Sequence, residues 1–174
     1  NGAELWRVRV SGSAPVLVFT APYSLAGHTW LPNNSIVVSV FETDSTGGVL
    51  FVIPATGGDA RLLARSKEES YVYPVSLHNN DRIVFTSETQ GRSQEIATVD
   101  LKDGGIQKLD RGSPFGFSRS GHLLYFGAET QASNAGGPLL ARAFDASVTA
   151  FLGPPVTIEE NTNHFNIAVD DFGT

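Results

Sequence analysis

The strongest constraint on the fold of this chain is an internal repeat, because a fixed period of roughly 20 to 50 residues is the signature of stacked repeat architectures. Four short apolar segments align with one another, at successive intervals of 45, 46 and 44 residues. They are Leu5-Trp6-Arg7-Val8-Arg9-Val10, Leu50-Phe51-Val52-Ile53-Pro54-Ala55, Ile96-Ala97-Thr98-Val99-Asp100-Leu101 and Leu140-Ala141-Arg142-Ala143-Phe144-Asp145. The chain is therefore expected to consist of copies of one structural unit of about 45 residues.

Each repeat is expected to contain two β-hairpins. The first three aligned segments lead into glycine-containing turns at 11–13, 56–58 and 103–105, followed by short outgoing strands at 15–19, 60–63 and 106–109. Glycine supplies the positive φ that short hairpin loops need. A second motif alternates with the first: a strand, a polar turn and a β-branched or aromatic strand, at 30–38, 77–85 and 117–125. Two hairpins per repeat predict a four-stranded antiparallel sheet.

A single sheet of this kind cannot bury its own apolar faces, so neighbouring copies must pack against one another. The β-propeller arranges such sheets, called blades, around a central channel, with about 40 to 50 residues per blade. A β-sandwich of about 16 strands is the alternative, but a sandwich has no reason to repeat at this interval. The sequence therefore predicts an all-β fold, a β-propeller fragment built from four-stranded antiparallel blades.

The whole chain, residues 1–174, is interpreted as one partial propeller domain. Its expected parts are a half blade at 4–19, full repeats at 28–64, 73–110 and 115–158, and an opening strand within 165–174. Open ends would leave strand edges unpaired and blade faces exposed, and both promote association. We therefore expect a homodimer in which two chains complete a ring of six to eight blades.

Two groups of residues resemble a known family. The segments Trp30-Leu31-Pro32-Asn33-Asn34 and Ser118-Arg119-Ser120-Gly121, with apolar strands that lead into Gly-Gly turns, resemble the TolB-type propeller repeat. The segments at 120–125, 139–145 and 152–156 are similar to the C-terminal propellers of bacterial serine/threonine kinases. This resemblance implies a bacterial protein and favours a periplasmic or extracellular location. It implies no single function, because such repeats occur in scaffolds, sensor domains and peptidase gates.

Composition excludes several classes of partner and site. The net charge of −6 is spread along the chain, so there is no basic surface for nucleic acid. The chain has no cysteine, which excludes disulfides and thiolate chemistry, and no apolar run of the length that a membrane span requires.

The candidate site residues are those expected at the central channel, where the loops that enter each innermost strand meet. Aligned positions there are His28, Tyr73, Phe115, His164, Phe165 and Asn166. One interpretation is a plug of packed aromatic and imidazole side chains. The other is an open site in which His28 or His164 acts as a general base near neutral pH.

Oxygen donors are densest near the last of these positions. Glu159, Glu160, Asn163 and Asn166 could supply ligands for Ca²⁺ or another divalent cation, which takes six to eight oxygens. The entering loops also carry the acidic segment Glu68-Glu69-Ser70. An acidic loop is more often simply solvated. No cofactor is therefore firmly predicted.

Other polar motifs are interpreted as turns. His78 and His122 fall in the polar hairpin turns. The segment from Gly116 to Ser120 approaches a nucleophile-elbow pattern around Ser118, but such an elbow needs a strand followed by a helix. The sequence thus favours a binding or scaffold module that holds a protein or small-molecule ligand at the channel mouth. The alternative is a hydrolase of esters, lactones or phosphotriesters, with a metal-assisted site in the channel.

Overall fold

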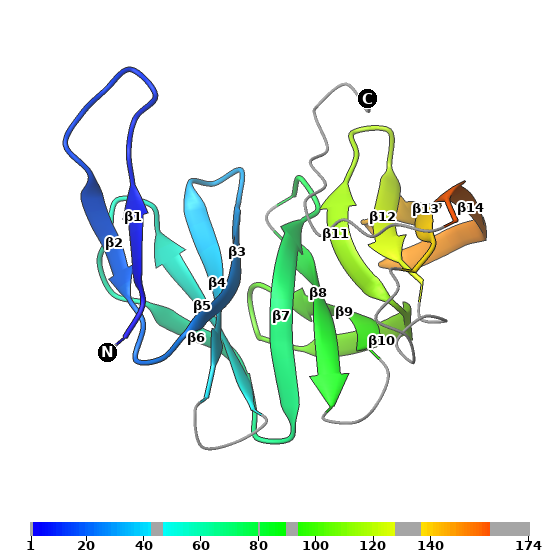
Figure 1. Cartoon of the computed structure of the whole chain (residues 1–174), viewed down its shortest axis with the longest axis horizontal. Helices are drawn as coiled ribbons and strands as arrows, with labels where there is room; N and C mark the ends of the chain where they lie inside the picture. Colours follow the sequence, from blue (N-terminus) through cyan, green and yellow to red (C-terminus); the bar gives the residue numbers. More distant parts are fainter. Residues whose placement is uncertain (1, 43–46, 80, 90–93, 128–136, 161–174) are drawn as a thin grey trace.

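Every regular element among the described residues is a β-strand (Figure 1). The computed structural model describes residues 2–42, 47–79, 81–89, 94–127 and 137–160. The strands are β1 (Glu4–Arg7), β2 (Val16–Thr20), β3 (Leu25–Trp30), β4 (Ser35–Phe41), β5 (Gly48–Pro54), β6 (Arg61–Ser66), β7 (Glu69–Ser76), β8 (Arg82–Thr89), β9 (Gln94–Asp100), β10 (Ile106–Arg111), β11 (Ser113–Phe117), β12 (His122–Phe126), β13 (Leu139–Asp145) and β14 (Ala150–Glu159).

The strands form one hairpin, β1–β2, and three four-stranded sheets. Each sheet is an antiparallel meander in chain order: β3 to β6 form the first sheet, β7 to β10 the second and β11 to β14 the third. The innermost strands β3, β7 and β11 contact one another from sheet to sheet (Figure 1). The predicted all-β fold of four-stranded antiparallel blades is confirmed. Among the described residues, no helix is long and apolar enough to cross a membrane.

In each blade, the tight turn between the third and fourth strands is expected to contain a glycine at positive φ. Gly12, Gly57 and Gly104 occupy this turn in the hairpin, the first sheet and the second sheet. Their φ angles are 84°, 84° and 78°, in the left-handed region that glycine reaches without a steric cost. The hairpin β1–β2 thus corresponds to the third and fourth strands of a blade.

The first and second sheets carry apolar side chains on both faces. Alternate side chains along a strand point to opposite faces, so one strand contributes to two cores. On β4, Ile36 and Val38 pack toward the hairpin, whereas Val37 packs toward the second sheet. Three apolar cores result: the first lies between the hairpin and the first sheet, the second between the first and second sheets, and the third between the second and third sheets. The first contains Val18, Ile36, Val38 and Ile53; the second contains Val37, Leu50, Ile83 and Phe85; the third contains Val84, Ile96, Leu123 and Phe144.

Buried hydroxyl groups link successive sheets at equivalent places on their second strands. The Ser39 hydroxyl on β4 donates to the Tyr71 carbonyl on β7. The Thr86 hydroxyl on β8 is 2.8 Å from the Ser113 hydroxyl on β11. Because both hydroxyls are fully buried, each needs this partner across the interface. They therefore help to set the position of one sheet on the next.

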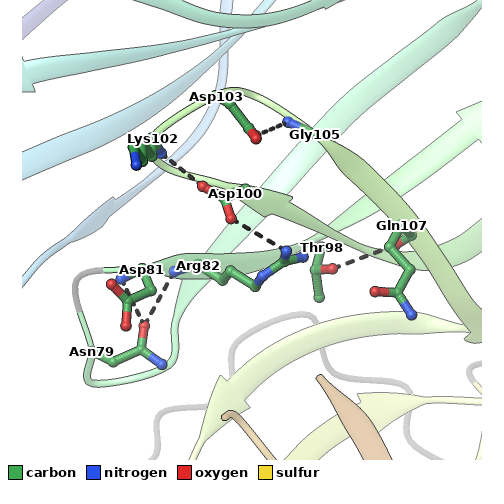
Figure 2. A network of polar contacts seen from close by, with 9 residues as sticks. All are labelled: Asn79, Asp81, Arg82, Thr98, Asp100, Lys102, Asp103, Gly105 and Gln107. Carbon is green, nitrogen blue, oxygen red and sulfur yellow. Dashed lines mark hydrogen bonds and ion pairs between the residues drawn. The ribbon is translucent and has the colours of Figure 1, made fainter. Parts of the chain in front are cut away.

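The polar turns of the second sheet satisfy their own backbone groups (Figure 2). The side-chain oxygen of Asn79 accepts from the backbone nitrogens of Asp81 and Arg82, at 3.1 and 3.2 Å. Asp100 accepts from the backbone nitrogen of Lys102 and pairs with Arg82 at 3.2 Å. The backbone hydrogen bond from Lys102, more than the charges nearby, lowers the pKa of the Asp100 carboxyl. These side chains stabilise the hairpins.

Candidate functional site

Three of the predicted channel residues lie on the innermost strands of successive sheets. His28 is on β3, Tyr73 on β7 and Phe115 on β11. His28 pairs with Val38 of the adjacent strand, whereas Tyr73 and Phe115 each fall where the pairing of their strand shifts. A β-bulge of this kind redirects a side chain relative to the regular strand.

Tyr73 has the most unusual backbone of the three. Its φ is 53°, in the left-handed region that few residues other than glycine adopt, and its side chain is 57% exposed. Strand β3 comes close to this backbone: a Cβ added to Gly27 would lie 3.0 Å from the Pro74 ring and 3.2 Å from the Tyr73 nitrogen. Such conformations are retained where the surrounding structure fixes them, and they are common at ligand-binding sites.

The three side chains differ in exposure. His28 is exposed, like Tyr73, whereas the Phe115 ring is half-buried and packs on Phe126, with 5.2 Å between ring centroids. The side chains carry an imidazole, a phenol and an apolar ring. This set, His28, Tyr73 and Phe115, is called the inner row below. It can stack on a planar or apolar group and exchange hydrogen bonds with it.

The remaining predicted site residues either lie outside the described residues or belong to another sheet than His28. His164, Phe165, Asn163 and Asn166 lie outside the described residues. Glu159 and Glu160 are exposed at the end of β14, in the third sheet, whereas His28 is in the first. Within the described ranges, no three His, Asp or Glu side chains form a group that could hold a metal ion. The calcium site therefore stays a prediction.

The acidic residue at the start of β7, Glu69, has a structural role that sequence reasoning did not identify. Glu69 pairs with Lys108 at 2.6 Å and accepts from the Ser87 hydroxyl at 2.9 Å, while Lys108 also pairs with Glu95 at 2.6 Å. Burial acts to raise the pKa of the Glu69 carboxyl, but the hydrogen bonds from Lys108 and Ser87 outweigh it and the pKa is lowered. Hydrogen bonds to Glu69 and Glu95 raise the pKa of Lys108.

The turn histidines also make local or inter-sheet contacts. His78 Nε2 is 2.9 Å from the Phe117 carbonyl and so joins the second sheet to the third. In the β11–β12 turn, Ser118 Oγ is 2.8 Å from Ser120 Oγ, which is 3.1 Å from His122 Nδ1. Ser118 Oγ also accepts from the His122 backbone nitrogen at 3.1 Å. These hydrogen bonds stabilise a turn between two strands. A hairpin turn is also what the sequence indicated for Ser118 and His122.

A groove of about 520 Å³ lies between the second and third sheets and was not indicated by the sequence. Arg142 lies beside the groove. It donates to Asp110, a lining residue, at 2.8 Å and to the Gly153 carbonyl at 2.6 Å, and it lies 4.5 Å from the centre of the Phe151 ring. Asp110, Arg111, Tyr125, Gly127, Pro138, Leu140, Pro155, Thr157 and Glu160 line the groove. The groove forms where β10 of the second sheet lies beside the third sheet, so residues far apart in sequence line it.

Comparison with known proteins identifies the fold and no family. Neither a family model nor a curated protein sequence matches the chain. Among solved structures, TolB from Acinetobacter baumannii superposes with a TM-score of 0.63 and 15% identity, over 85% of this chain and 36% of that one. A puromycin-hydrolyzing peptidase of Mycobacterium tuberculosis superposes with a TM-score of 0.57 and 15% identity, over 80% of this chain and 23% of that one.

A chain of a nidogen/laminin complex superposes more loosely, with a TM-score of 0.51 and 12% identity, over 86% of this chain and 70% of that one. The present chain thus spans about a third or less of the length of the first two similar structures. The match supports a TolB-like propeller fold.

Proposed function

We propose that this chain is part of a β-propeller binding or scaffold module, and that the inner row contacts a protein or small-molecule ligand at the channel mouth. The observation that carries the proposal is Tyr73, an exposed phenol held at positive φ on a bulge of an innermost strand. An exposed aromatic ring with a polar tip is the side chain that binding surfaces favour. The neighbouring contacts of Gly27 and Pro74 keep it in place before a ligand arrives.

The cross-sheet contacts support the same role. Ser39, Thr86 and His78 each contact the following sheet, so these polar side chains help to hold neighbouring blades in position. A rigid frame with an exposed row of side chains suits recognition. By the resemblance to kinase propellers, we further propose that the module serves a larger bacterial protein as a periplasmic or extracellular sensor.

A displayed library of random peptides tests the binding proposal. Peptides selected on the unaltered protein should lose most of their affinity for Tyr73→Ala and His28→Ala, measured by biolayer interferometry. They should keep it for Leu62→Ala, because Leu62 is similarly exposed but lies on the outermost strand β6. Selected peptides that bind Tyr73→Ala as well as the unaltered protein would refute a site at the inner row.

The hydrolase alternative has its own test. Turnover of activated esters, lactones and phosphotriesters is measured before and after chelation, with His28→Ala and His164→Ala alongside. Under our proposal no turnover depends on either histidine or on a metal. Activity that falls with a histidine substitution and with chelation would replace the binding module by a metal-assisted hydrolase.

A further inference from the structure

The groove between the second and third sheets lies where the third sheet departs from the repeat. Its floor is a row of paired residues on the face that packs toward the second sheet: Tyr125 on β12 pairs with Leu140 on β13, and Leu140 pairs with Thr157 on β14. The opposite wall is the end of β10, with Asp110 and Arg111. The same place between the first and second sheets is filled by larger side chains.

The buried hydroxyl groups define equivalent positions in the two interfaces. Between the first and second sheets, Ser39 donates to the Tyr71 carbonyl. Between the second and third sheets, Thr86 bonds to Ser113 at the corresponding place. Ser113 on β11 is therefore the equivalent of Tyr71 on β7, and each lies two residues before its member of the inner row.

A tyrosine ring fills this place between the first and second sheets. Tyr71 is buried, and its ring centroid lies 5.0 Å from that of Phe85, which occupies on β8 the position of Tyr125 on β12. Ser113 has no ring to lay over Tyr125, and its neighbour is a glycine: a Cβ on Gly112 would lie 2.9 Å from Tyr125 Cδ2. Small residues thus leave Tyr125 as a wall of the groove.

The outer strands differ in the same way. In the second sheet, the corresponding row ends in Lys108, the partner of Ala97 on β9. Its ammonium group lies 2.6 Å from Glu69 and from Glu95, so the long side chain covers that part of the sheet. In the third sheet, the row ends in the short side chain of Thr157. A serine and a threonine thus replace two of the larger side chains of the repeat where the groove lies.

Two residues that can donate hydrogen bonds line the groove from different sheets. Arg111 lines it from β10, and within the described ranges its guanidinium forms no ion pair. Tyr125 lines it from β12; burial raises the pKa of its phenol, so the hydroxyl keeps its proton at neutral pH. Arg142 hydrogen-bonds this phenol and also pairs with Asp110 at 2.8 Å, which neutralises the Asp110 carboxylate.

Most of the remaining lining is apolar, with Leu140, Pro138 and Pro155. A volume of about 520 Å³ is within the range of small-molecule sites, roughly 300 to 1,000 Å³, which combine apolar walls with a few polar groups. Glu160 is also on the lining, and its negative charge disfavours an anion that carries more than one charge.

We propose that this groove binds a carboxylate with an apolar body. The Arg111 guanidinium receives the carboxylate through paired hydrogen bonds, the Tyr125 hydroxyl donates a further one, and the apolar body lies on Leu140 and the two prolines. A free apolar acid and the C-terminal residue of a peptide share this chemistry. The groove and the inner row have no residue in common, so this site is independent of the proposed function.

Isothermal titration calorimetry with isocaproate tests the site, with isocaproamide as the neutral match. The acid should bind about tenfold more tightly than the amide or better, because only the acid forms a charged pair with Arg111. Arg111→Gln should therefore weaken the acid about tenfold and change the amide little, whereas Tyr125→Phe should weaken both. The matched control is Arg65→Gln, at the equivalent arginine of β6, which should leave both affinities unchanged.

Filling the groove gives a steric test. Thr157→Trp should abolish binding of both compounds, whereas Val156→Trp, at the neighbouring residue on the opposite face of β14, should not. Circular dichroism verifies the folding of each variant. The proposal is overturned if isocaproate shows no binding at millimolar concentration, if its binding survives Thr157→Trp, or if Arg111→Gln leaves it unchanged.

Two further compounds define the ligand. Acetyl-glycyl-glycyl-leucine that binds more tightly than isocaproate would support the C-terminal residue of a peptide as the ligand, and the opposite order would support a free acid. Inorganic phosphate that binds more tightly than either would overturn a singly charged ligand. Peptide selection at the inner row is measured separately, so the two proposals fail independently.

Discussion

At the scale of single residues, the most informative position is Tyr73. Its residue type was identified as a channel candidate from the alignment of repeats, but its left-handed backbone was not. Nothing in the local sequence requires a positive φ at a tyrosine in a strand. The conformation occurs at the bulge in β7, where Gly27 of β3 comes close to the Tyr73 backbone.

Substitutions at Tyr73 should reveal this constraint in stability. Tyr73→Val should destabilise the fold relative to Tyr73→Gly by about 1 to 2 kcal/mol, because a β-branched residue at positive φ is strongly disfavoured. Urea unfolding measures the difference. The control is Phe41→Val, at an exposed aromatic on β4, which should change little because valine suits a strand. Equal stabilities of Tyr73→Val and Tyr73→Gly would contradict the assigned backbone.

The Glu69 ion pair predicts a defined pH dependence. The pKa of Glu69 is lower in the folded chain than its ordinary value of 4.5, so the unfolded chain binds the proton more tightly. Its contribution to stability is therefore present above about pH 4.5 and is lost as the pH falls through the lower folded value. Glu69→Gln should reduce the free energy of unfolding at pH 7 and have a smaller effect at pH 3.

The control for this prediction is Asp59→Asn, at an exposed carboxylate. It should change the unfolding free energy little at either pH. A Glu69→Gln effect that is the same at pH 7 and pH 3 would mean that packing, and not the charge pair with Lys108, accounts for the loss.

At the scale of the elements, the turn between the third and fourth strands serves two purposes. Its glycine allows a tight hairpin, which the sequence predicted, and its lack of a side chain allows the turn to lie against the preceding sheet. The second purpose is visible at Gly104, next to the Leu63 carbonyl of β6. A backbone atom cannot move aside easily, so an added Cβ would displace one sheet from the other.

Gly104→Ala should therefore cost more than the left-handed conformation alone explains. Gly121→Ala is a close control, because the φ angles are 78° and 79° but a Cβ on Gly121 would meet only the Phe144 carbonyl at 3.9 Å. We expect Gly104→Ala to be about 1 to 3 kcal/mol more destabilising than Gly121→Ala in urea unfolding, in line with the usual cost of overpacking. Similar losses for the two variants would argue against a tight contact between the first and second sheets.

At the scale of the whole molecule, stability and assembly are linked. Three cores hold the described sheets together, and the homodimer predicted from the sequence would add further contacts. If unfolding of the dimer yields two unfolded chains, each tenfold rise in concentration adds about 1.4 kcal/mol to its apparent stability. The thermal midpoint of the unaltered protein should therefore rise with concentration. A concentration-independent midpoint for the unaltered protein would indicate that its stability comes from one chain alone.

The sequence alone determined the class of the fold, because hairpin turns and apolar alternation are local properties that recur every 44 to 46 residues. It also identified Gly57 and Gly104 as turn residues and placed His28, Tyr73 and Phe115 at matching points of successive repeats. The tertiary structure decided what these residues contact. Residues far apart in sequence form the hydrogen bond between Thr86 and Ser113 and the ion pair between Glu69 and Lys108. Such residues also line the groove beside Arg142. A repeat period predicts that sheets stack, but the partners across each interface depend on the packing of whole sheets.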